Sequence, residues 1–173
     1  MVPVSDVLQD NRTGAILSDD RTYRYQLWRH WDVYKPRLGW IMLNPSTADE
    51  TEDDPTIRRC INFAKGWGYG SIVVGNLFAL RATEPKELYD HPDPIGPENN
   101  EHLREICDEA EAVVAAWGAH GDYQQRGWAV RQMLDVELLA LGTTMDDQPV
   151  HPLYQPGDTE PFALDAEPGG GRE

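Results

Sequence analysis

An apolar run that stops abruptly at a proline constrains the fold of this chain more than any other feature. Residues 40–43, Trp-Ile-Met-Leu, are followed at once by residues 44–47, Asn-Pro-Ser-Thr. A short apolar run bounded by turn formers is typical of a fully buried strand, and Pro45 cannot donate a ladder hydrogen bond. The polar residues therefore follow the carboxyl end of a strand, where ligand crevices form in open α/β sheets. The same residues also fit a plain turn in which Ser46 or Thr47 caps a helix.

Apolar runs and amphipathic segments alternate along the rest of the chain. Further strands are predicted at 71–78, 112–118 and 137–142, and helices at 56–66, 98–112 and 124–134. The acidic, proline-rich residues 79–97 are predicted to form a long loop. This order predicts an α/β fold of three layers, α/β/α, in which a four-stranded parallel sheet has helices on both faces.

The N-terminal part predicts a β-hairpin. Residues 14–17 and 22–28 are rich in strand-forming residues and flank the turn-forming residues 18–21. In the second arm, Tyr23, Tyr25 and Leu27 alternate with polar residues, which indicates a half-buried strand. We divide the chain into an N-terminal segment with the first hairpin arm (1–21), a single α/β domain (22–157) and a disordered acidic tail (158–173).

The chain of 173 residues is strongly acidic, with a formal net charge of −15. This charge opposes nonspecific binding to phosphate backbones, which depends on Lys and Arg. It also fits a halophilic host, where high salt screens acidic surfaces, and composition leaves both interpretations open. No apolar run approaches the roughly 20 residues that span a bilayer, and the N-terminus has no signal-peptide pattern. We expect a cytoplasmic monomer that does not contact membranes.

Distinctive polar groups follow each predicted strand of the parallel sheet. They are Asn44-Pro45, Asn76, Trp117-Gly118 and, beyond the fourth strand, His151-Pro152. Each of them alone is typical of a turn or a structural residue. Because the carboxyl ends of parallel strands lie along one edge of a sheet, together they predict a single pocket.

Three longer motifs carry a resemblance to known proteins. Residues 43–48 (Leu-Asn-Pro-Ser-Thr-Ala), 53–60 and 76–83 (Asn-Leu-Phe-Ala-Leu-Arg-Ala-Thr) resemble an uncharacterised bacterial, archaeal and phage family, catalogued as domain of unknown function 1643. This resemblance covers roughly residues 22–154. More distantly, the order of strand-end motifs is similar to that of the uracil-DNA glycosylase superfamily, whose members have a four-stranded parallel sheet between helices.

The glycosylase resemblance implies a hydrolase that cleaves the N-glycosidic bond of a nucleobase in DNA or a nucleotide. It implies that Asn44 positions water, that Asn76 reads the base edge and that His151 stabilises the departing base. Further candidate base-binding residues are Pro45, Ser46, Phe78, Trp117 and Gly118. Candidate phosphate-binding residues are Thr47, Arg58 and Arg81. We expect no metal or other cofactor, and two cysteines cannot ligate an iron–sulfur cluster.

The acidic residues 49–54 leave several interpretations open. Asp49, Asp53 or Asp54 could supply a catalytic carboxylate, with Asp49 our first candidate, or the loop could bind a divalent metal. It could also be a solvated loop that caps the following helix.

Residues 153 and 154, Leu-Tyr, replace the wedge with which the glycosylase superfamily enters duplex DNA. The expected partner is therefore a nucleotide or single-stranded or modified DNA. A noncatalytic module that binds a nucleotide or modified base, and a different nucleotide-processing enzyme, are the alternatives.

Overall fold

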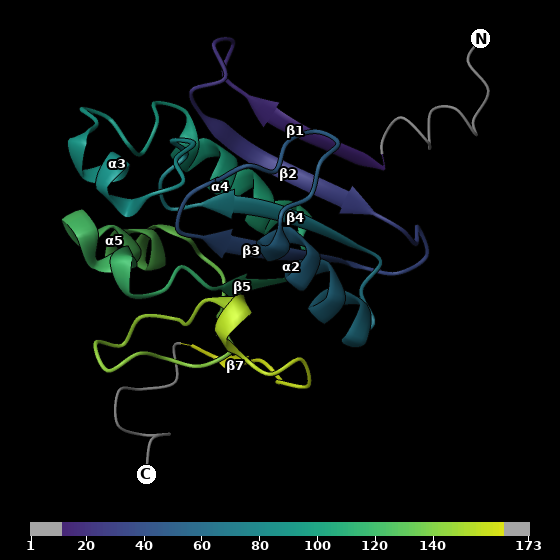
Figure 1. Ribbon diagram of the computed structural model, residues 1–173. Helices are drawn as coiled ribbons and strands as arrows, with labels where there is room; N and C mark the ends of the chain where they lie inside the picture. Colours follow the sequence, from purple (N-terminus) through teal and green to yellow (C-terminus); the bar gives the residue numbers. More distant parts are fainter. Residues whose placement is uncertain (1–11, 165–173) are drawn as a thin grey trace, which may run out of the picture.

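The computed structural model describes residues 12–164, and in that part of the chain seven strands form one mixed sheet (Figure 1). Their order across the sheet is β1-β2-β4-β3-β5-β6-β7. The strands are β1 (Thr13–Leu17), β2 (Arg24–His30), β3 (Arg37–Met42), β4 (Ser71–Asn76), β5 (Ala112–Ala115), β6 (Leu138–Ala140) and β7 (Phe162–Ala163). The four neighbours β4, β3, β5 and β6 run parallel, whereas β1, β2 and β7 pair antiparallel. The α/β class is as predicted, but the sheet is wider than four strands and is mixed.

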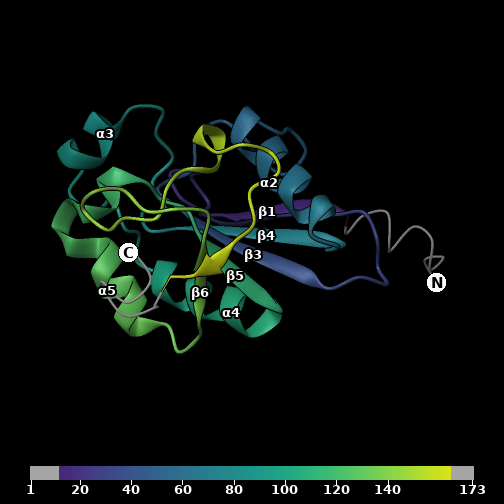
Figure 2. The same cartoon turned by 90° about the horizontal axis from the view of Figure 1, so that it is seen from below.

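Helices cover both faces of the sheet. The α-helices are α2 (Pro55–Gly66), α3 (Pro85–Asp90), α4 (Asn99–Glu109) and α5 (Arg126–Met133), and short 3₁₀ helices are η1 (Ala119–Gln125) and η2 (Pro152–Tyr154). Figure 2 shows α2 on one side of the sheet and α4 and α5 on the other. None of the helices between residues 12 and 164 is long and apolar enough to cross a membrane.

Local sequence signals explain where two of these helices begin. Asp54 caps α2 by accepting a hydrogen bond from the Ile57 N–H at 2.9 Å, and Pro55 occupies the first helical position, as the sequence predicted. Helix α3 lies inside the segment predicted to be a loop. It begins with a capping box between Glu84 and Glu87. The helix was missed because it has too few apolar residues to show the hydrophobic periodicity of a helix.

Two apolar clusters fill the space on either side of the sheet. On the α2 side, Trp40 of β3 packs against Phe63 and Trp67, with ring centroids 6.2 and 6.0 Å apart. On the α4 side, Leu103 and Ile106 pack against the other face of the central strands. The parallel strands are therefore buried on both faces, which is why their sequences are continuously apolar.

Strand β2 is more buried than its sequence pattern indicated. Arg24 and Gln26, on which the prediction of a half-buried strand depended, are buried along with Tyr25 and Leu27. The reason is that the hairpin does not stand apart: β2 pairs with β4 and becomes an interior strand of the sheet.

The C-terminal part also differs from the prediction of a disordered tail beginning at residue 158. Strand β7 pairs with β6, and Leu164 is buried in the core on the α4 side. Residues 1–11 of the predicted N-terminal segment and residues 165–173 of the predicted tail lie outside the described residues.

The chain reverses its direction of travel across the sheet at β3. After β3 the chain runs through α2 to β4, which lies on one side of β3. After β4 it runs through α4 to β5, which lies on the other side of β3. A crevice is expected at the carboxyl ends of the strands where such a reversal occurs.

Candidate functional site

A cavity of about 580 Å³ lies at the carboxyl ends of the parallel strands, and we call it the strand-end cavity. Its walls come from the segments that follow β3, β4 and β5, from the start of α2 and from the turn before η2. Six of the strand-end residues that the sequence singled out line it: Asn44, Ser46, Asn76, Trp117, Gly118 and His151. The tertiary structure therefore brings the strand-end groups together in one place.

Asn76 ends β4 and presents a buried amide without a partner. The residue is 1% exposed, and neither Oδ1 nor Nδ2 has a hydrogen-bond partner among the described residues. Its backbone carbonyl, in contrast, accepts a hydrogen bond from Asn99 Nδ2 at 2.8 Å. The backbone is thus fixed while the side-chain amide keeps one acceptor and two donor hydrogens free beside the cavity.

The amide nitrogen of Asn44 holds its side chain in place. Its Nδ2 donates to the carbonyl oxygens of Pro45 at 3.0 Å and Ala82 at 2.8 Å. These two donations fix the orientation of the side chain, and Oδ1 has no hydrogen bond among the described residues. An amide oxygen can orient a water molecule by accepting a hydrogen bond from it, but it cannot remove a proton from that water as a base.

His151 is a neutral imidazole with a defined tautomer. Its Nδ1 accepts a hydrogen bond from the Leu153 N–H at 3.2 Å, so the proton of the neutral ring resides on Nε2. Burial lowers the pKa of His151 below its ordinary value of 6.5, although the carboxylate of Asp54 opposes that shift. Near neutral pH the ring is therefore uncharged and offers Nε2–H as a donor.

Trp117 and Gly118 shape the wall after β5. The indole N–H of Trp117 donates to Gln148 Oε1 at 2.8 Å, so its polar atom is already engaged. Gly118 has a φ of +76° and a ψ of −172°, a conformation that is almost restricted to glycine. These two residues form an apolar wall rather than supplying polar contacts.

The remaining candidates for base and phosphate binding do not line the strand-end cavity. Pro45 and Phe78 are buried, and Phe78 packs on Tyr123 with ring centroids 5.7 Å apart. The three candidate phosphate-binding residues are also absent from its walls: Thr47, Arg58 and Arg81. Thr47 and Arg58 are exposed, and Arg81 is half-buried.

The acidic residues 49–54 fold around the buried guanidinium of Arg29. Arg29 pairs with Asp53 Oδ1 at 2.7 Å, and its Nη2 donates to the backbone carbonyls of Asp49 at 2.6 Å and Glu52 at 3.1 Å. Backbone carbonyls and one carboxylate together compensate the buried charge. Much of the acidity of this segment is therefore used to build the loop.

Asp49 does not occupy the position expected of a catalytic base. It does not line the strand-end cavity, and its Oδ1 accepts from the backbone N–H groups of Thr51 and Glu52. These hydrogen bonds lower the pKa of Asp49 below its ordinary value. Within residues 12–164, no three His, Cys, Asp or Glu side chains are placed to hold a metal ion together.

Asp54 does line the cavity, but both of its carboxylate oxygens are engaged. Oδ1 accepts from Ile57 N–H, and Oδ2 accepts from Ala48 N–H at 3.3 Å. The carboxylate thus caps α2 and fixes the preceding loop. Its charge acts on the cavity without a free oxygen for proton transfer.

Sequence analysis did not single out Arg24, which lies on the cavity wall at the start of β2. Its side chain is 2% exposed, and burial lowers its pKa to about 10. The pattern of β2 predicted that Arg24 would point toward solvent. Only the pairing of β2 with β4 places it inside.

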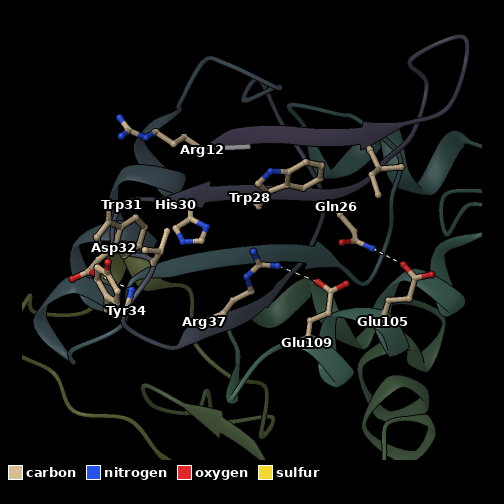
Figure 3. A pocket seen from close by; sticks show the side chains of 12 residues that line it. Arg12, Gln26, Trp28, His30, Trp31, Asp32, Tyr34, Arg37, Glu105 and Glu109 are labelled. Atoms are coloured by element: carbon tan, nitrogen blue, oxygen red, sulfur yellow. Dashed lines mark hydrogen bonds and ion pairs between the residues drawn. The ribbon is translucent and has the colours of Figure 1, made fainter. Parts of the chain in front are cut away.

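A second and larger cavity, of about 700 Å³, lies on the opposite face near α4 (Figure 3). Four of its polar side chains form two pairs: Arg37 donates to Glu109 at 3.1 Å, and Gln26 donates to Glu105 at 2.9 Å. His30 Nε2, in contrast, has no hydrogen-bond partner among the described residues. Tyr34 at its rim is 95% exposed. The strand-end cavity gathers polar groups from the ends of several parallel strands, so it is the better candidate site despite its smaller volume.

Comparison with known proteins gives one match. The model of a family described as "Protein of unknown function (DUF1643)" matches residues 24–153, which agrees with the resemblance of the sequence motifs. No curated protein and no solved structure matches the chain. The matched segment contains all six of the strand-end residues that line the cavity.

Proposed function

Because the chain belongs to the DUF1643 family of proteins of unknown function, and the family match spans the strand-end residues of the cavity, we propose a function from the chemistry of those residues. The strand-end cavity binds a nucleobase, and the protein is a hydrolase of the N-glycosidic bond that joins the base to its sugar. The substrate is a nucleotide or single-stranded or modified DNA.

The observation that carries this proposal is the unpartnered amide of Asn76. A buried amide without hydrogen bonds destabilises a fold, so its presence on a cavity wall is best explained by a ligand that completes it. Asn offers an acceptor and donors side by side, which matches the adjacent donor and acceptor groups on the edge of a nucleobase. Asn76 therefore supplies base recognition.

Asn44 and His151 supply complementary chemistry around the bond that breaks. As the bond between C1′ and the base nitrogen breaks, its electron pair moves onto the base and the sugar becomes oxocarbenium-like. Nε2–H of His151 donates to an oxygen of the base where negative charge develops. Oδ1 of Asn44 orients a water whose oxygen bonds to C1′, and the water proton passes to the departing base or to solvent.

The distant resemblance to uracil-DNA glycosylases supports this assignment. Within the wider mixed sheet, the four neighbours β4, β3, β5 and β6 are parallel, and the strand-end residues follow their carboxyl ends, which supports the proposal. Tyr154, which lies at the cavity and is 81% exposed, stands where the superfamily carries its duplex wedge. We therefore assign a single-stranded or mononucleotide substrate.

One observation favours a second candidate function, a noncatalytic module that binds a nucleotide or modified base. Asp54 is the only carboxylate that lines the described strand-end cavity, and both of its oxygens are occupied by backbone N–H groups. A site without a free carboxylate is well suited to binding but has no strong base to activate water.

A base-release assay separates these two functions. Purified protein is incubated, with and without EDTA and at low and high salt, with nucleotides and with single- and double-stranded oligonucleotides that carry uracil or other modified bases. The hydrolase predicts base release that persists in EDTA and is lost in Asn44→Ala and His151→Gln. Binding without release from any substrate would favour the binding module, and loss of release in EDTA would favour a different, metal-dependent nucleotide-processing enzyme.

A further inference from the structure

Arg24 differs from the other buried arginines in how little of its guanidinium is satisfied. Three arginines are buried within residues 12–164: Arg24, Arg29 and Arg126. Arg29 has its ion pair and several carbonyl acceptors, and Arg126 donates to Leu77 O at 2.9 Å and to Asn100 Oδ1 at 2.7 Å. Arg24 makes one hydrogen bond, from Nη1 to Ala48 O at 3.0 Å, and its Nε has no partner.

The charge of Arg24 is also without a direct counterion. No carboxylate of the described residues forms an ion pair with it, and the oxygens of nearby Asp54 are taken by backbone N–H groups. With a pKa of about 10 the guanidinium stays charged at neutral pH. A buried charge that is neither paired nor fully hydrogen-bonded is costly, so its retention on a cavity wall indicates an anionic ligand.

Arg24 and Asn76 are placed to act on the same ligand. Both line the strand-end cavity, and the start of β2 lies beside the end of β4, since Arg24 N–H donates to Ala79 O at 2.9 Å. The volume of about 580 Å³ is within the range of small-molecule sites. A ligand with a base edge at one end and an anion at the other can therefore contact both side chains.

We propose that Arg24 binds a phosphate group of the ligand, so that the strand-end cavity recognises a phosphorylated nucleoside rather than a free nucleoside or base. This inference rests on the proposed function for the base contact at Asn76. A guanidinium with unsatisfied N–H groups is well suited to phosphate oxygens. The net charge of −15 opposes long polyanions, which favours a mononucleotide over a polymer.

Calorimetric titration with matched probes tests this inference. The probes are a panel of purine and pyrimidine nucleosides, the 5′-monophosphate of each, a single-stranded trinucleotide and inorganic phosphate. We expect the wild-type protein to bind one monophosphate about 10- to 100-fold more tightly than its nucleoside, the gain typical of hydrogen bonds to a charged group. Arg24→Gln should remove that difference and leave the nucleoside affinity within about twofold.

Two further variants make the test independent of folding defects. Arg29→Lys is the matched control, because Arg29 is a buried arginine on the same strand that does not line the cavity. It should lower the free energy of unfolding without changing the ratio of monophosphate to nucleoside affinity. If Arg24→Gln does not fold, Arg24→Lys takes its place. Lysine retains the positive charge but lacks the planar guanidinium group, so the ratio of monophosphate to nucleoside affinity should fall only in part.

The outcomes separate the phosphate site from the base site. Equal affinity of the wild-type protein for nucleoside and monophosphate would overturn the phosphate site and leave the base site intact. Binding of inorganic phosphate that is lost in Arg24→Gln, without binding of any nucleoside, would support the phosphate site and overturn the proposed function. Tighter, Arg24-dependent binding of the trinucleotide would identify the anion as an internal phosphodiester. Failure of every probe to bind would overturn both proposals.

Discussion

Two buried asparagines, 23 residues apart, differ in how their side-chain amides are hydrogen-bonded. Nδ2 of Asn99 donates to the carbonyls of Asn76 at 2.8 Å and Leu77 at 3.0 Å, which fixes the segment at the end of β4. The Asn76 amide, one residue before that segment turns, has no partner. Asn99 holds the strand end through its Nδ2 alone, because its Oδ1 has no partner among the described residues, whereas Asn76 has neither amide atom engaged.

This difference predicts opposite effects on stability. Asn76→Leu removes an unsatisfied buried amide and no hydrogen bond, so the free energy of unfolding should stay the same or rise by about 1 kcal/mol while nucleotide binding is lost. Asn99→Ala should lower it by roughly 1–3 kcal/mol, because two buried carbonyls lose their donor. Urea unfolding and ligand titration measure both quantities. A large loss of stability in Asn76→Leu would mean that Asn76 is a structural residue.

Protonation of His151 predicts a loss of stability on mild acidification. Burial makes the pKa of the folded-state ring lower than its ordinary value of 6.5, so the unfolded chain binds the proton more readily. Stability should therefore fall as the pH drops through 6.5 toward the lower folded-state pKa. His30, whose pKa is also lowered by burial, contributes with the same sign.

The measurement is urea unfolding at pH 7.5 and pH 5.5. Aspartates whose pKa is lowered below the ordinary 3.8, such as Asp20 and Asp49, act only at lower pH, so this interval reports on histidines. His151→Gln should unfold with a smaller difference between the two pH values than the wild-type protein. An unchanged difference would show that the folded state does not disfavour the charged His151 ring.

At the scale of elements, the segment between β3 and α2 is built as a loop closed over two buried arginines of β2. Arg29 binds the backbone carbonyls of Asp49 and Glu52, and Arg24 binds that of Ala48. Acidic side chains complete the structure: Asp49 stabilises the turn, Asp53 pairs with Arg29, and Asp54 caps α2. The loop is therefore held in place by strand β2 and by its own acidic side chains.

Arg29→Ala should be strongly destabilising. It leaves Asp53 and several carbonyls without their partner, and loss of one member of a buried pair typically costs about 3–5 kcal/mol. Glu50→Gln should change stability by less than about 1 kcal/mol, because Glu50 pairs with Arg21 at the surface. Chemical unfolding of both variants gives the comparison. Similar small effects would show that the loop is not held through Arg29.

At the scale of the whole molecule, self-repulsion dominates the electrostatics. Thirty acidic residues face fifteen basic ones. Two of the ion pairs of basic residues with carboxylates lie at the surface, at Lys86–Asp90 and Arg21–Glu50, where they contribute little. The remaining negative charge destabilises the compact state unless salt screens it.

The melting temperature should therefore rise with salt. Raising NaCl from about 0.05 to 1 M shortens the screening length to about 3 Å and weakens repulsion between exposed carboxylates. Differential scanning calorimetry across this range measures the change, and sodium sulfate separates screening from general salting-out. A melting temperature that is constant or falls with NaCl would contradict this account of the surface charge.

The sequence by itself determined the α/β class, the buried strands and the polar groups that end them. These follow from local physics: continuous apolar runs require burial on both faces, and Pro45 has no N–H with which to continue a ladder. Since parallel strands bring their carboxyl ends to one edge, the meeting of Asn44, Asn76 and His151 at one cavity could be predicted without coordinates. The cap of α2 at Asp54 also depends only on residues that are neighbours in the sequence, so it could be predicted in the same way.

Only the tertiary structure decided which polar residues are buried and which of them are satisfied. Strand β2 alternates as a half-buried strand would, yet its pairing with β4 buries Arg24 and Arg29. The acidic residues 49–54 then supply acceptors to Arg29, and the carbonyl of Ala48 supplies the acceptor to Arg24. Burial of a side chain depends on what packs over its strand, which residues distant in sequence supply. The free amide of Asn76 and the unsatisfied guanidinium of Arg24 are therefore properties of the fold, because a missing partner is defined only when every neighbour is in place.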